Sequence, residues 1–412
     1  MRILLQNSLF YPHLAGGTER SLYSLAQELS AAGHVVDILT TTGKPQGAPE
    51  VLTAREIPGI SGKIYQAPAS GLYEVVPLKG KQAPSALDRT IHHALNVYSY
   101  RWLRLTRKFV TLRRPDVLHT NNLVGMTCTL WRAAREHRLR IVHTIRDLHL
   151  LCPRTTMLRA DGTSCTRLCW SCRLFSHFKL RATRQVDVVT SPSRYTLERH
   201  LHFGGFRGVR AEVVPNACEV IPAVIPDRTT RTAVQGLYLG SLAPHKGLSP
   251  LLSALAQLFA DPACEALRFV FAGEGELKNA VEDFCRQHAK RCAYLGIVEG
   301  EAKQQVLRES DFVVIPSLWS ETFGRVILDG FSYGLPVIGS DRGGIPEIIR
   351  HESDGQIVPP EPEALGKAMA RYVHDHELRR RHGRRARERI HEFSLQKQVE
   401  RFLRLYRPEG SC

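Results

Sequence analysis

Short apolar runs alternate with helical stretches along nearly the whole chain, and this alternation restricts the fold more than any other feature. Near the start, Ile3–Gln6 is predicted as a buried strand, Gly17–Ala31 as an amphipathic helix ending at Gly33, and Val35–Thr40 as a second strand. The next runs predicted as strands are Val117–His119, Ile141–Thr144, Val186–Thr190 and Val213–Val214. Strands that alternate with helices favour a parallel sheet with helices on both faces.

A second alternating series follows a stretch with little periodicity, Ala217–Arg231, which we interpret as a hinge. Its predicted strands are Gly236–Leu239, Phe269–Ala272, Tyr294–Leu295, Phe312–Ile315 and Val337–Gly339. The chain ends in helical sequence from Pro362 to Leu405. We therefore expect two α/β domains, 1–220 and 221–395, followed by a terminal helix in 396–412; 412 residues suffice for both domains.

The composition is that of a soluble globular protein, with 43% hydrophobic and 23% charged residues. No window approaches eighteen consecutive apolar residues, so no membrane-spanning helix is expected. The first residues, Met1–Asn7, are too short an apolar run and too soon polar for a signal peptide. We therefore expect a cytoplasmic location and ten reduced Cys without disulfides.

The formal net charge of +16 is unevenly distributed. The first 225 residues hold 30 Lys and Arg against 15 Asp and Glu, and the remainder is nearly neutral. This asymmetry suggests that the first half meets something anionic: nucleic acid, a membrane surface or an acidic substrate. Because no nucleic-acid-binding motif is present, an anionic membrane surface is the preferred partner. A general bias toward Arg is the alternative reading.

Residues Ile91–Arg113 are predicted to form one basic, aromatic helix. It interleaves cations with aromatic and aliphatic residues, namely Arg101, Arg104, Arg107 and Lys108 with Tyr98, Tyr100, Trp102, Leu103, Leu105 and Phe109. Such a helix fits contact with a membrane surface, where it would hold the protein peripherally. An ordinary helix with a solvated face and inward-facing Leu and Phe fits equally well.

The run Glu321–Asp329 lies between two apolar strands, so Glu321 falls at the carboxyl end of a strand and just before a predicted helix, Phe323–Tyr333. In an open α/β sheet, ligands bind at that edge. The backbone N–H groups of Phe323 and Gly324 would face an anion at the helix N-terminus. The two acids are eight positions apart, which lets both address one extended ligand.

This run resembles the acid-x7-acid motif of retaining glycosyltransferases of family 4, which have the GT-B architecture of two Rossmann-like domains facing each other across a cleft. Five further segments match the family in the same order, from about residue 1 to about residue 395. They are Gly16–Glu19, Pro215–Ala217, Gly240–Gly247, Ala272–Gly275 and Gly343–Glu347. Single motifs of this kind are weak, whereas six in order are specific.

The resemblance implies transfer of a sugar from a nucleotide diphosphate sugar. Glu321 would accept hydrogen bonds from hydroxyls of the donor sugar, and Asp329 would hold the ribose where the family usually has Glu. Lys246 would neutralise the diphosphate, which the loop of Gly16 and Gly17 could approach closely. Ser241 stands where the family usually has Arg. The implied donor-binding set is Gly16, Gly17, Ser241, Lys246, Glu274, Phe323, Gly324 and Asp329. The absence of an Asp-x-Asp pair argues against a catalytic metal.

On the acceptor side, polar residues follow two predicted strands of the first half: His119, Asn121, Arg146 and Asp147. The family often has His at the positions of Asn121 and Arg146. With Glu321, we expect His119, Asn121 and Asp147 to form the catalytic set. His119 could instead be a buried histidine with satisfied ring nitrogens.

Four cysteines fall within 21 residues: Cys152, Cys165, Cys169 and Cys172. Four thiolates suit a tetrahedral zinc, so these cysteines predict a structural zinc site. Small buried residues, or a loop with free thiols, are the alternatives, and an iron–sulfur cluster is a further one.

Together these features predict a retaining, metal-independent glycosyltransferase of surface polysaccharide or glycan synthesis, acting on a membrane-associated saccharide or lipid-linked acceptor. Nucleic acid is not an expected partner. The alternative is a catalytically silent relative that binds sugar or lipid as an assembly factor. The replacements at Ser241 and Asp329 motivate that alternative, while Glu321 and Lys246 count against it.

Overall fold

The chain forms two compact α/β units in a computed structural model that describes residues 1–11, 17–42, 53–70, 91, 94–159, 163–225 and 231–408. Unit 1 comprises Met1–Arg159, Cys165–Pro215 and Leu395–Cys412, and unit 2 comprises Ala160–Ser164 and Asn216–Ser394. The second unit begins close to the predicted hinge. No helix among the described residues is long and apolar enough to cross a membrane.

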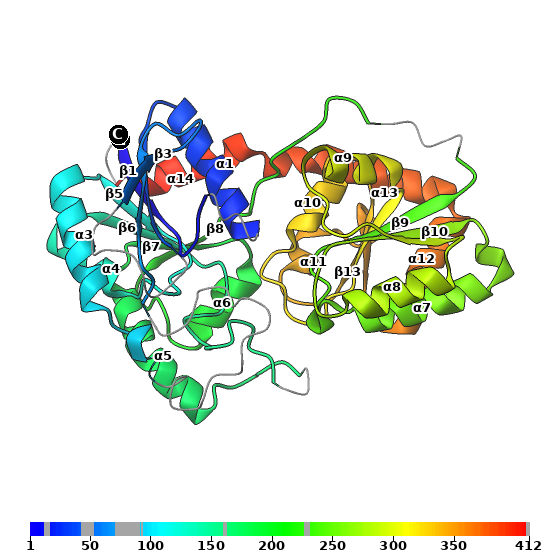
Figure 1. Cartoon of the computed structure of the whole chain (residues 1–412), viewed down its shortest axis with the longest axis horizontal. Coiled ribbons are helices and arrows are strands. Elements are labelled where there is room, and N and C mark those ends of the chain that lie inside the picture. Colours follow the sequence, from blue (N-terminus) through cyan, green and yellow to red (C-terminus); the bar gives the residue numbers. More distant parts are fainter. Residues whose placement is uncertain are drawn as a thin grey trace. The chain divides into compact units, whose positions relative to one another are not determined.

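Unit 1 is built on an eight-stranded sheet with the order β3-β4-β2-β1-β5-β6-β7-β8 (Figure 1). The strands are β1 (Arg2–Gln6), β2 (Val35–Thr41), β3 (Thr53–Glu56), β4 (Lys63–Ala67), β5 (Val117–Thr120), β6 (Arg140–Thr144), β7 (Val188–Ser191) and β8 (Arg210–Val213). All neighbouring pairs are parallel except β3 with β4. The parallel sheet confirms the prediction from the alternating pattern.

Alternate residues of the central strand face two different apolar layers in unit 1. Ile3 and Leu5 join one cluster with α1 (Gly17–Ala31) and α14 (Leu395–Tyr406), while Leu4 joins another with α3 (Tyr100–Arg113) and α4 (Thr129–Glu136). Two more helices, α5 (Trp170–Ala182) and α6 (Arg194–His202), precede β7 and β8. The period of two along each strand therefore places helices on both faces of the sheet.

The last helix, α14, returns to unit 1 and lies beside α1 (Figure 1). Phe402 and Tyr406 are buried in the layer that also holds Ile3 and Leu22, and Leu403 is partly buried against it. Helix α14 thus completes a core to which β1 and α1 also contribute.

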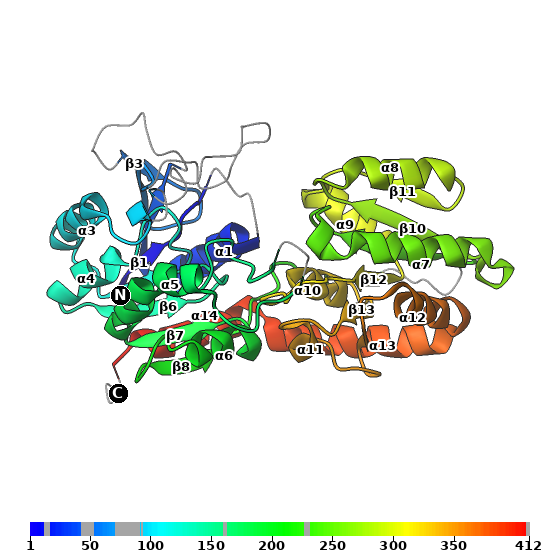
Figure 2. The ribbon, with the colours of Figure 1, turned by 90° about the horizontal axis from the view of Figure 1, so that it is seen from below.

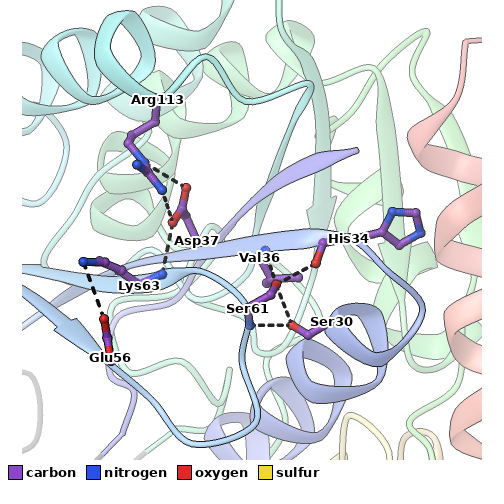
Figure 3. A network of polar contacts seen from close by, with 8 residues as sticks. All are labelled: Ser30, His34, Val36, Asp37, Glu56, Ser61, Lys63 and Arg113. Carbon is purple, nitrogen blue, oxygen red and sulfur yellow. Dashed lines mark hydrogen bonds and ion pairs between the residues drawn. The ribbon is translucent and has the colours of Figure 1, made fainter.

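A polar network fastens β2 to its neighbours (Figure 3). The buried carboxylate of Asp37 accepts two bonds from the Arg113 guanidinium, at 3.1 and 3.2 Å, and a third from the Lys63 backbone N–H. Nearby, the Ser61 hydroxyl donates to the His34 carbonyl at 2.6 Å. A buried charge that is paired and bonded in this way ties α3 and β4 to the sheet.

The predicted helix Ile91–Arg113 is wrong in its start. Helix α3 begins at Tyr100, because Ser99 is extended and its side chain accepts the Trp102 backbone N–H, a typical N-cap. Trp102 and Phe109, which we considered for a membrane face, are buried in the core. Two of the helix's cations are also engaged within unit 1, since Arg101 donates to the Pro68 carbonyl and Arg107 pairs with Glu136.

Unit 2 is a six-stranded, fully parallel sheet with the order β11-β10-β9-β12-β13-β14 (Figure 2). Its strands are β9 (Val234–Leu239), β10 (Leu267–Ala272), β11 (Cys292–Tyr294), β12 (Phe312–Ile315), β13 (Val337–Ser340) and β14 (Gly355–Val358). Its helices are α7 (Leu248–Ala260), α8 (Lys278–Gln287), α9 (Gly300–Glu309), α10 (Arg325–Ser332), α11 (Ile345–Ile348), α12 (Pro362–His374) and α13 (His376–Arg389).

Two apolar layers again enclose the sheet of unit 2. Phe269 and Phe271 pack into the layer of α7 and α12, and Val270, between them in sequence, packs into the layer of α9 and α10. The strand order reverses at β9, which pairs with β10 on one side and with β12 on the other. Such a reversal is where an open α/β sheet binds ligands, at the carboxyl ends of its strands.

Candidate active site

The most tightly bonded polar group at this edge of unit 2 is the carboxylate of Glu321, in the loop between β12 and α10. Lys246 Nζ lies 2.6 Å from Glu321 Oε1, and Ser317 Oγ donates to the same oxygen at 2.8 Å. Glu321 is buried at 8% exposure, whereas the Lys246 side chain is partly exposed. The two residues are 75 positions apart, so the sheet, and not local sequence, brings them together.

The charge of this pair is set by two opposing effects. Burial acts to raise the pKa of Glu321, but the attraction and hydrogen bond of Lys246, aided by Ser317, outweigh it and lower that pKa. The Lys246 ammonium also lies 4.8 Å from the centre of the Trp319 ring. Glu321 is therefore a carboxylate at neutral pH, held against a cation that solvent can reach.

Glycine turns allow the backbone to close tightly around this pair. Gly247 has φ +77°, and a Cβ there would stand 1.8 Å from the Pro316 carbonyl oxygen. Gly343 has φ +62°, and a Cβ there would stand 2.2 Å from the Glu321 carbonyl oxygen. Only glycine fits such positions without strain. The turn after β9 and the turn after β13 thus both press against the segment that carries Glu321.

Three other residues predicted for donor binding lie near this edge with partners of their own. Asp329, on α10, pairs with Lys303 of α9 at 2.7 Å. Glu274 accepts Lys278 at 3.0 Å and the Tyr294 hydroxyl at 3.2 Å. Ser241 is exposed, and its carbonyl accepts the Tyr238 hydroxyl. A ligand of Asp329 or Glu274 would have to share or displace these partners.

The N-terminal turn of α10 follows Glu321 directly. Gly324 caps the helix in the left-handed conformation with φ +89°, so α10 begins at Arg325, two residues later than predicted. Phe323 is buried and packs against Phe393. Of the two glycines predicted near the diphosphate, Gly17 is the first residue of α1, and Gly16 lies outside the described residues.

The carboxyl ends of β5 and β6 in unit 1 gather the predicted acceptor-side residues Asn121, Arg146 and Asp147. Arg146 Nε donates to Asn121 Oδ1 at 3.0 Å, and Asn121 Nδ2 donates to the Gln6 carbonyl. Asp147 accepts the Asn122 side chain at 3.0 Å and the His149 backbone N–H at 2.7 Å. All three predicted residues line one small pocket.

Two titratable groups beside this pocket have displaced pKa values. Burial raises the pKa of Asp147 to about 6, although the His149 backbone N–H and Lys179 act in the opposite direction. Burial lowers the pKa of Lys179, at 1% exposure, to about 7. The Lys179 nitrogen lies 2.9 Å from His149 Nε2 and 3.6 Å from the centre of the Phe175 ring. Carboxyl groups that titrate near neutrality are typical of proton-transfer sites.

His119 does not join this group, which corrects its prediction as a catalytic residue. The side chain is fully buried, with Nδ1 2.7 Å from the Tyr406 hydroxyl and Nε2 2.7 Å from Thr144 Oγ1. Phe402 packs on its ring. Burial lowers its pKa far below the usual value. His119 is a satisfied core histidine between the sheet and α14, the alternative that the sequence left open.

The predicted zinc site is likewise not formed. All four cysteines belong to the described residues, and no three His, Cys, Asp or Glu side chains there are arranged to hold a metal ion. Cys152 packs with Leu148 and Met157 in a small apolar cluster, while Cys169 caps α5 and lies 3.2 Å from the Ser171 hydroxyl. The thiols are near neighbours all the same: burial first, and then Cys169, Cys152 and Cys165, raise the pKa of Cys172 to about 12.

Several residues of these sites, His149 and Lys179 among them, had escaped the sequence analysis. Ser317 directly follows the strand end at Pro316, a position that could have drawn notice. Lys303, Gln6 and Asn122 give no such signal, since Lys303 comes from a separate helix and Gln6 from the first strand. Their roles depend on how the sheets order the strands.

Known protein families account for nearly the whole chain. Residues 15–220 match the family described as Glycosyltransferase Family 4, and residues 231–389 match Glycosyl transferases group 1. The chain belongs to glycosyltransferase family 4. The first match alone spans half of the chain, and the boundary between the two matches falls close to the boundary between the two units.

Relatives of this family 4 glycosyltransferase extend over most of its length. An uncharacterized 42.6 kDa protein of the cps region of Klebsiella pneumoniae is 28% identical over 353 residues, 85% of this chain and 88% of the relative. The phosphatidyl-myo-inositol mannosyltransferase of Mycolicibacterium smegmatis is 28% identical over 399 residues, 95% and 90% of the two chains. Among solved structures, Anabaena Alr3699/HepE in complex with UDP-glucose matches with a TM-score of 0.65 at 16% identity over 98% of each chain. The fold is GT-B.

Proposed function

We propose that this glycosyltransferase transfers a sugar, with retention of configuration, from a nucleotide diphosphate sugar to a membrane-associated saccharide or lipid-linked acceptor in surface glycan synthesis. The observation that carries the proposal is the Lys246–Glu321 pair at the point where the sheet of unit 2 reverses its strand order. Family membership supplies the reaction type, and the pair supplies groups suited to the donor.

Lys246 suits the diphosphate because its cation is already partly exposed at the end of a glycine turn. When the glycosyl bond breaks, negative charge develops on the leaving diphosphate, and a fixed cation there stabilises the transition state. No metal is needed for this part of the chemistry, since the lysine supplies the positive charge. Metal independence is therefore part of the proposal.

Glu321 suits the sugar because it remains a carboxylate beside that cation. Its role is to accept hydrogen bonds from sugar hydroxyls and so to orient the anomeric carbon, not to attack it. Asp329 would hold the ribose after exchanging Lys303, and this exchange costs little because a partly exposed ion pair contributes only about 0–1 kcal/mol.

The acceptor would meet the pocket of Asn121, Arg146 and Asp147 in unit 1. A carboxyl group with a pKa of about 6 can take a proton from, or orient, an acceptor hydroxyl near neutral pH. The relatives suggest the chemistry of the acceptor: one is named a phosphatidyl-myo-inositol mannosyltransferase, and another is named for a cps region. Both names fit a lipid-linked or surface glycan, and a peripheral position on the cytoplasmic face of a membrane.

The alternative, a silent sugar- or lipid-binding relative, has two observations in its favour. Asp329 is already neutralised by Lys303, and Ser241 offers no cation where the family usually has Arg. The intact Lys246–Glu321 pair favours an active enzyme over this alternative.

A panel of UDP-, GDP-, ADP- and dTDP-sugars, incubated with lipid-linked acceptors, tests the proposal. We expect one donor to release its nucleoside diphosphate in an acceptor-dependent reaction, with loss of release in Glu321→Gln. Proton NMR of the product gives the anomeric configuration. Binding of a donor without any turnover across the panel favours the silent alternative, and inversion of configuration contradicts the retaining mechanism.

A further inference from the structure

Helix α5 of unit 1 presents large apolar side chains to solvent instead of to the core. Trp170, Leu174 and Phe178 are 77%, 61% and 59% exposed. They stand at positions i, i+4 and i+8, so they form one stripe along the helix. Exposed apolar side chains are common singly, but an aligned row of three of this size marks an interaction surface.

A basic groove runs beside this stripe. It encloses about 880 Å³ between α5, the segment 166–168 before it and the segment 202–207 after α6 (α5 and α6 are labelled in Figure 1). Five arginines line it, and no lining residue is acidic: Arg167, Arg173, Arg181, Arg184 and Arg207. Within the part of the chain that the structure describes, none of the five is within ion-pair distance of a carboxylate.

The opposite side of α5 packs against the rest of unit 1, so the apolar stripe and the arginines are not part of the core. Phe175, Ser176 and Lys179 face inward and are buried. At 100° per residue, the apolar stripe and the cations Arg173 and Arg181 share one outward sector of about 140°. The segment 163–186 contains no Asp or Glu. The outward face is thus both apolar and uniformly cationic.

We propose that this α5 surface, the exposed row Trp170, Leu174 and Phe178 with the arginine groove beside it, docks the protein on an anionic phospholipid bilayer. The arginines would contact lipid phosphates, and the three apolar side chains would enter the boundary between headgroups and acyl chains. Tryptophan and arginine both favour that boundary, because each combines a polar group with an apolar or weakly hydrated body.

The combination of features selects a bilayer over other occupants. A soluble phosphate would use the groove but not the apolar row, which would remain in water. A protein partner would cover the row, but five arginines that pair with no carboxylate among the described residues favour an extended negative surface at its margin. An anionic bilayer provides both: an apolar interior for the exposed row and negatively charged headgroups for the arginines.

This proposal places the membrane contact on α5, and not on the helix that the sequence suggested, whose aromatic Trp102 and Phe109 are buried. It deepens the proposed function by bringing the enzyme to the surface that carries its acceptor. It is tested without substrate, so its failure and that of the proposed function are separate results.

Vesicle co-sedimentation of the full chain, with phosphatidylcholine alone and with added phosphatidylglycerol, measures the docking. We expect strong binding only to the anionic vesicles, weakened by 0.5 M salt. The variant Arg173→Gln, Arg181→Gln, Arg184→Gln and Arg207→Gln should bind at least about tenfold more weakly, since each near-surface cation contributes roughly fivefold. A matched control removes four exposed arginines from α13 instead, by changing Arg380, Arg381, Arg384 and Arg385 to Gln, and should bind like the parent.

Insertion of the apolar row has its own readout. Lipids brominated in the acyl chain should quench Trp170, and the quenching should disappear in Trp170→Phe, because Trp102 and Trp131 are buried and Trp319 lies beside Lys246 in unit 2, not in the unit that carries α5. Circular dichroism establishes that each variant is folded. Three results would overturn the proposal: unchanged binding of the groove variant, an equal loss in the α13 control, or no acyl-chain quenching of Trp170. Complete competition by millimolar glycerol phosphate would also overturn it, since that result identifies a pocket for small anions.

Discussion

Lys246 Nζ and Glu321 Oε1 lie 2.6 Å apart at the edge of the unit 2 sheet, so the two charges most suited to a donor sugar nucleotide neutralise each other. A diphosphate and a sugar hydroxyl could take over these contacts together. The site is thereby preorganised without leaving either charge unpaired.

Glu321→Gln should lower kcat/KM by at least about a hundredfold, because it removes the charge from contacts that strengthen toward the transition state. Steady-state kinetics, with the donor that the panel of nucleotide sugars identifies, measure the loss. Glu282→Gln on α8 is the matched control, since that carboxylate belongs only to a surface ion pair. Near-normal transfer by the Glu321 variant would remove this residue from the site.

Lys246→Ala should weaken the binding of nucleoside diphosphate by roughly 1.5–3 kcal/mol, the range for a lost charged hydrogen bond. Calorimetric titration gives the affinity directly. Lys367→Ala, which breaks an exposed pair with Glu363 on α12, controls for the loss of one positive charge. Equal affinities of parent and Lys246→Ala would show that the diphosphate binds elsewhere.

The Lys303–Asp329 pair makes a separate prediction about the ribose. If Asp329 accepts ribose hydroxyls, Asp329→Asn should weaken the binding of nucleotide by about 1 kcal/mol or more, whereas Lys303→Met should leave it equal or stronger. The double variant should then resemble Asp329→Asn alone. A loss of affinity in Lys303→Met as large as that in Asp329→Asn would assign the pair a purely structural role.

The pKa of Asp147 leads to a prediction for the acidic limb of the pH dependence of kcat/KM. Its pKa of about 6 means that the carboxylate is lost below that pH, so log kcat/KM should fall as the pH drops through about 6. Asp147→Asn should abolish this inflection together with most of the activity. An inflection that persists unchanged in the variant would assign it to another group.

The lowered pKa of Lys179 leads to a prediction of how the free energy of unfolding changes with pH. Its pKa in the folded protein is about 7, below the ordinary value of 10.5, so between these values the unfolded chain binds a proton that the folded chain does not. The free energy of unfolding should therefore rise with pH across this window. Lys179→Met should flatten that rise, and its stabilising effect should be greatest below pH 7. Urea titrations at pH 6.5, 8 and 9.5 measure it; parallel curves for parent and variant would contradict the assignment.

More of the fold than of the candidate site could be predicted from the sequence. Apolar runs predict buried parallel strands because both faces of such strands are covered, and all eleven expected in the two units correspond to observed strands in whole or part. The strands β3, β4 and β14 were missed, since none of Thr53–Glu56, Lys63–Ala67 and Gly355–Val358 is a continuous apolar run. The early start predicted for α3 failed because one serine, Ser99, caps the helix.

Side-chain direction explains most of what could not be predicted in the sites. His119 follows Leu118 on a strand. The sequence shows neither which face of the sheet its side chain lies on nor that Tyr406 contacts it there. The four cysteines suggested a metal by their spacing, yet spacing does not orient thiols. The α5 surface, by contrast, could have been recognised, because Trp170, Leu174 and Phe178 already show the i, i+4, i+8 spacing in the sequence.

The bond between His119 and Tyr406 joins residues 287 positions apart, and it has a consequence for synthesis of the chain. Unit 1 draws its strands from the first half of the chain but closes one apolar layer with Val399, Phe402, Leu405 and Tyr406. A ribosome making this protein must finish all of unit 2 before that layer can be sealed. Until then Ile3, Leu22 and their neighbours are not covered by α14, so the nascent chain should depend on chaperones late in translation. Removal of residues 395–412 should leave the same apolar layer exposed.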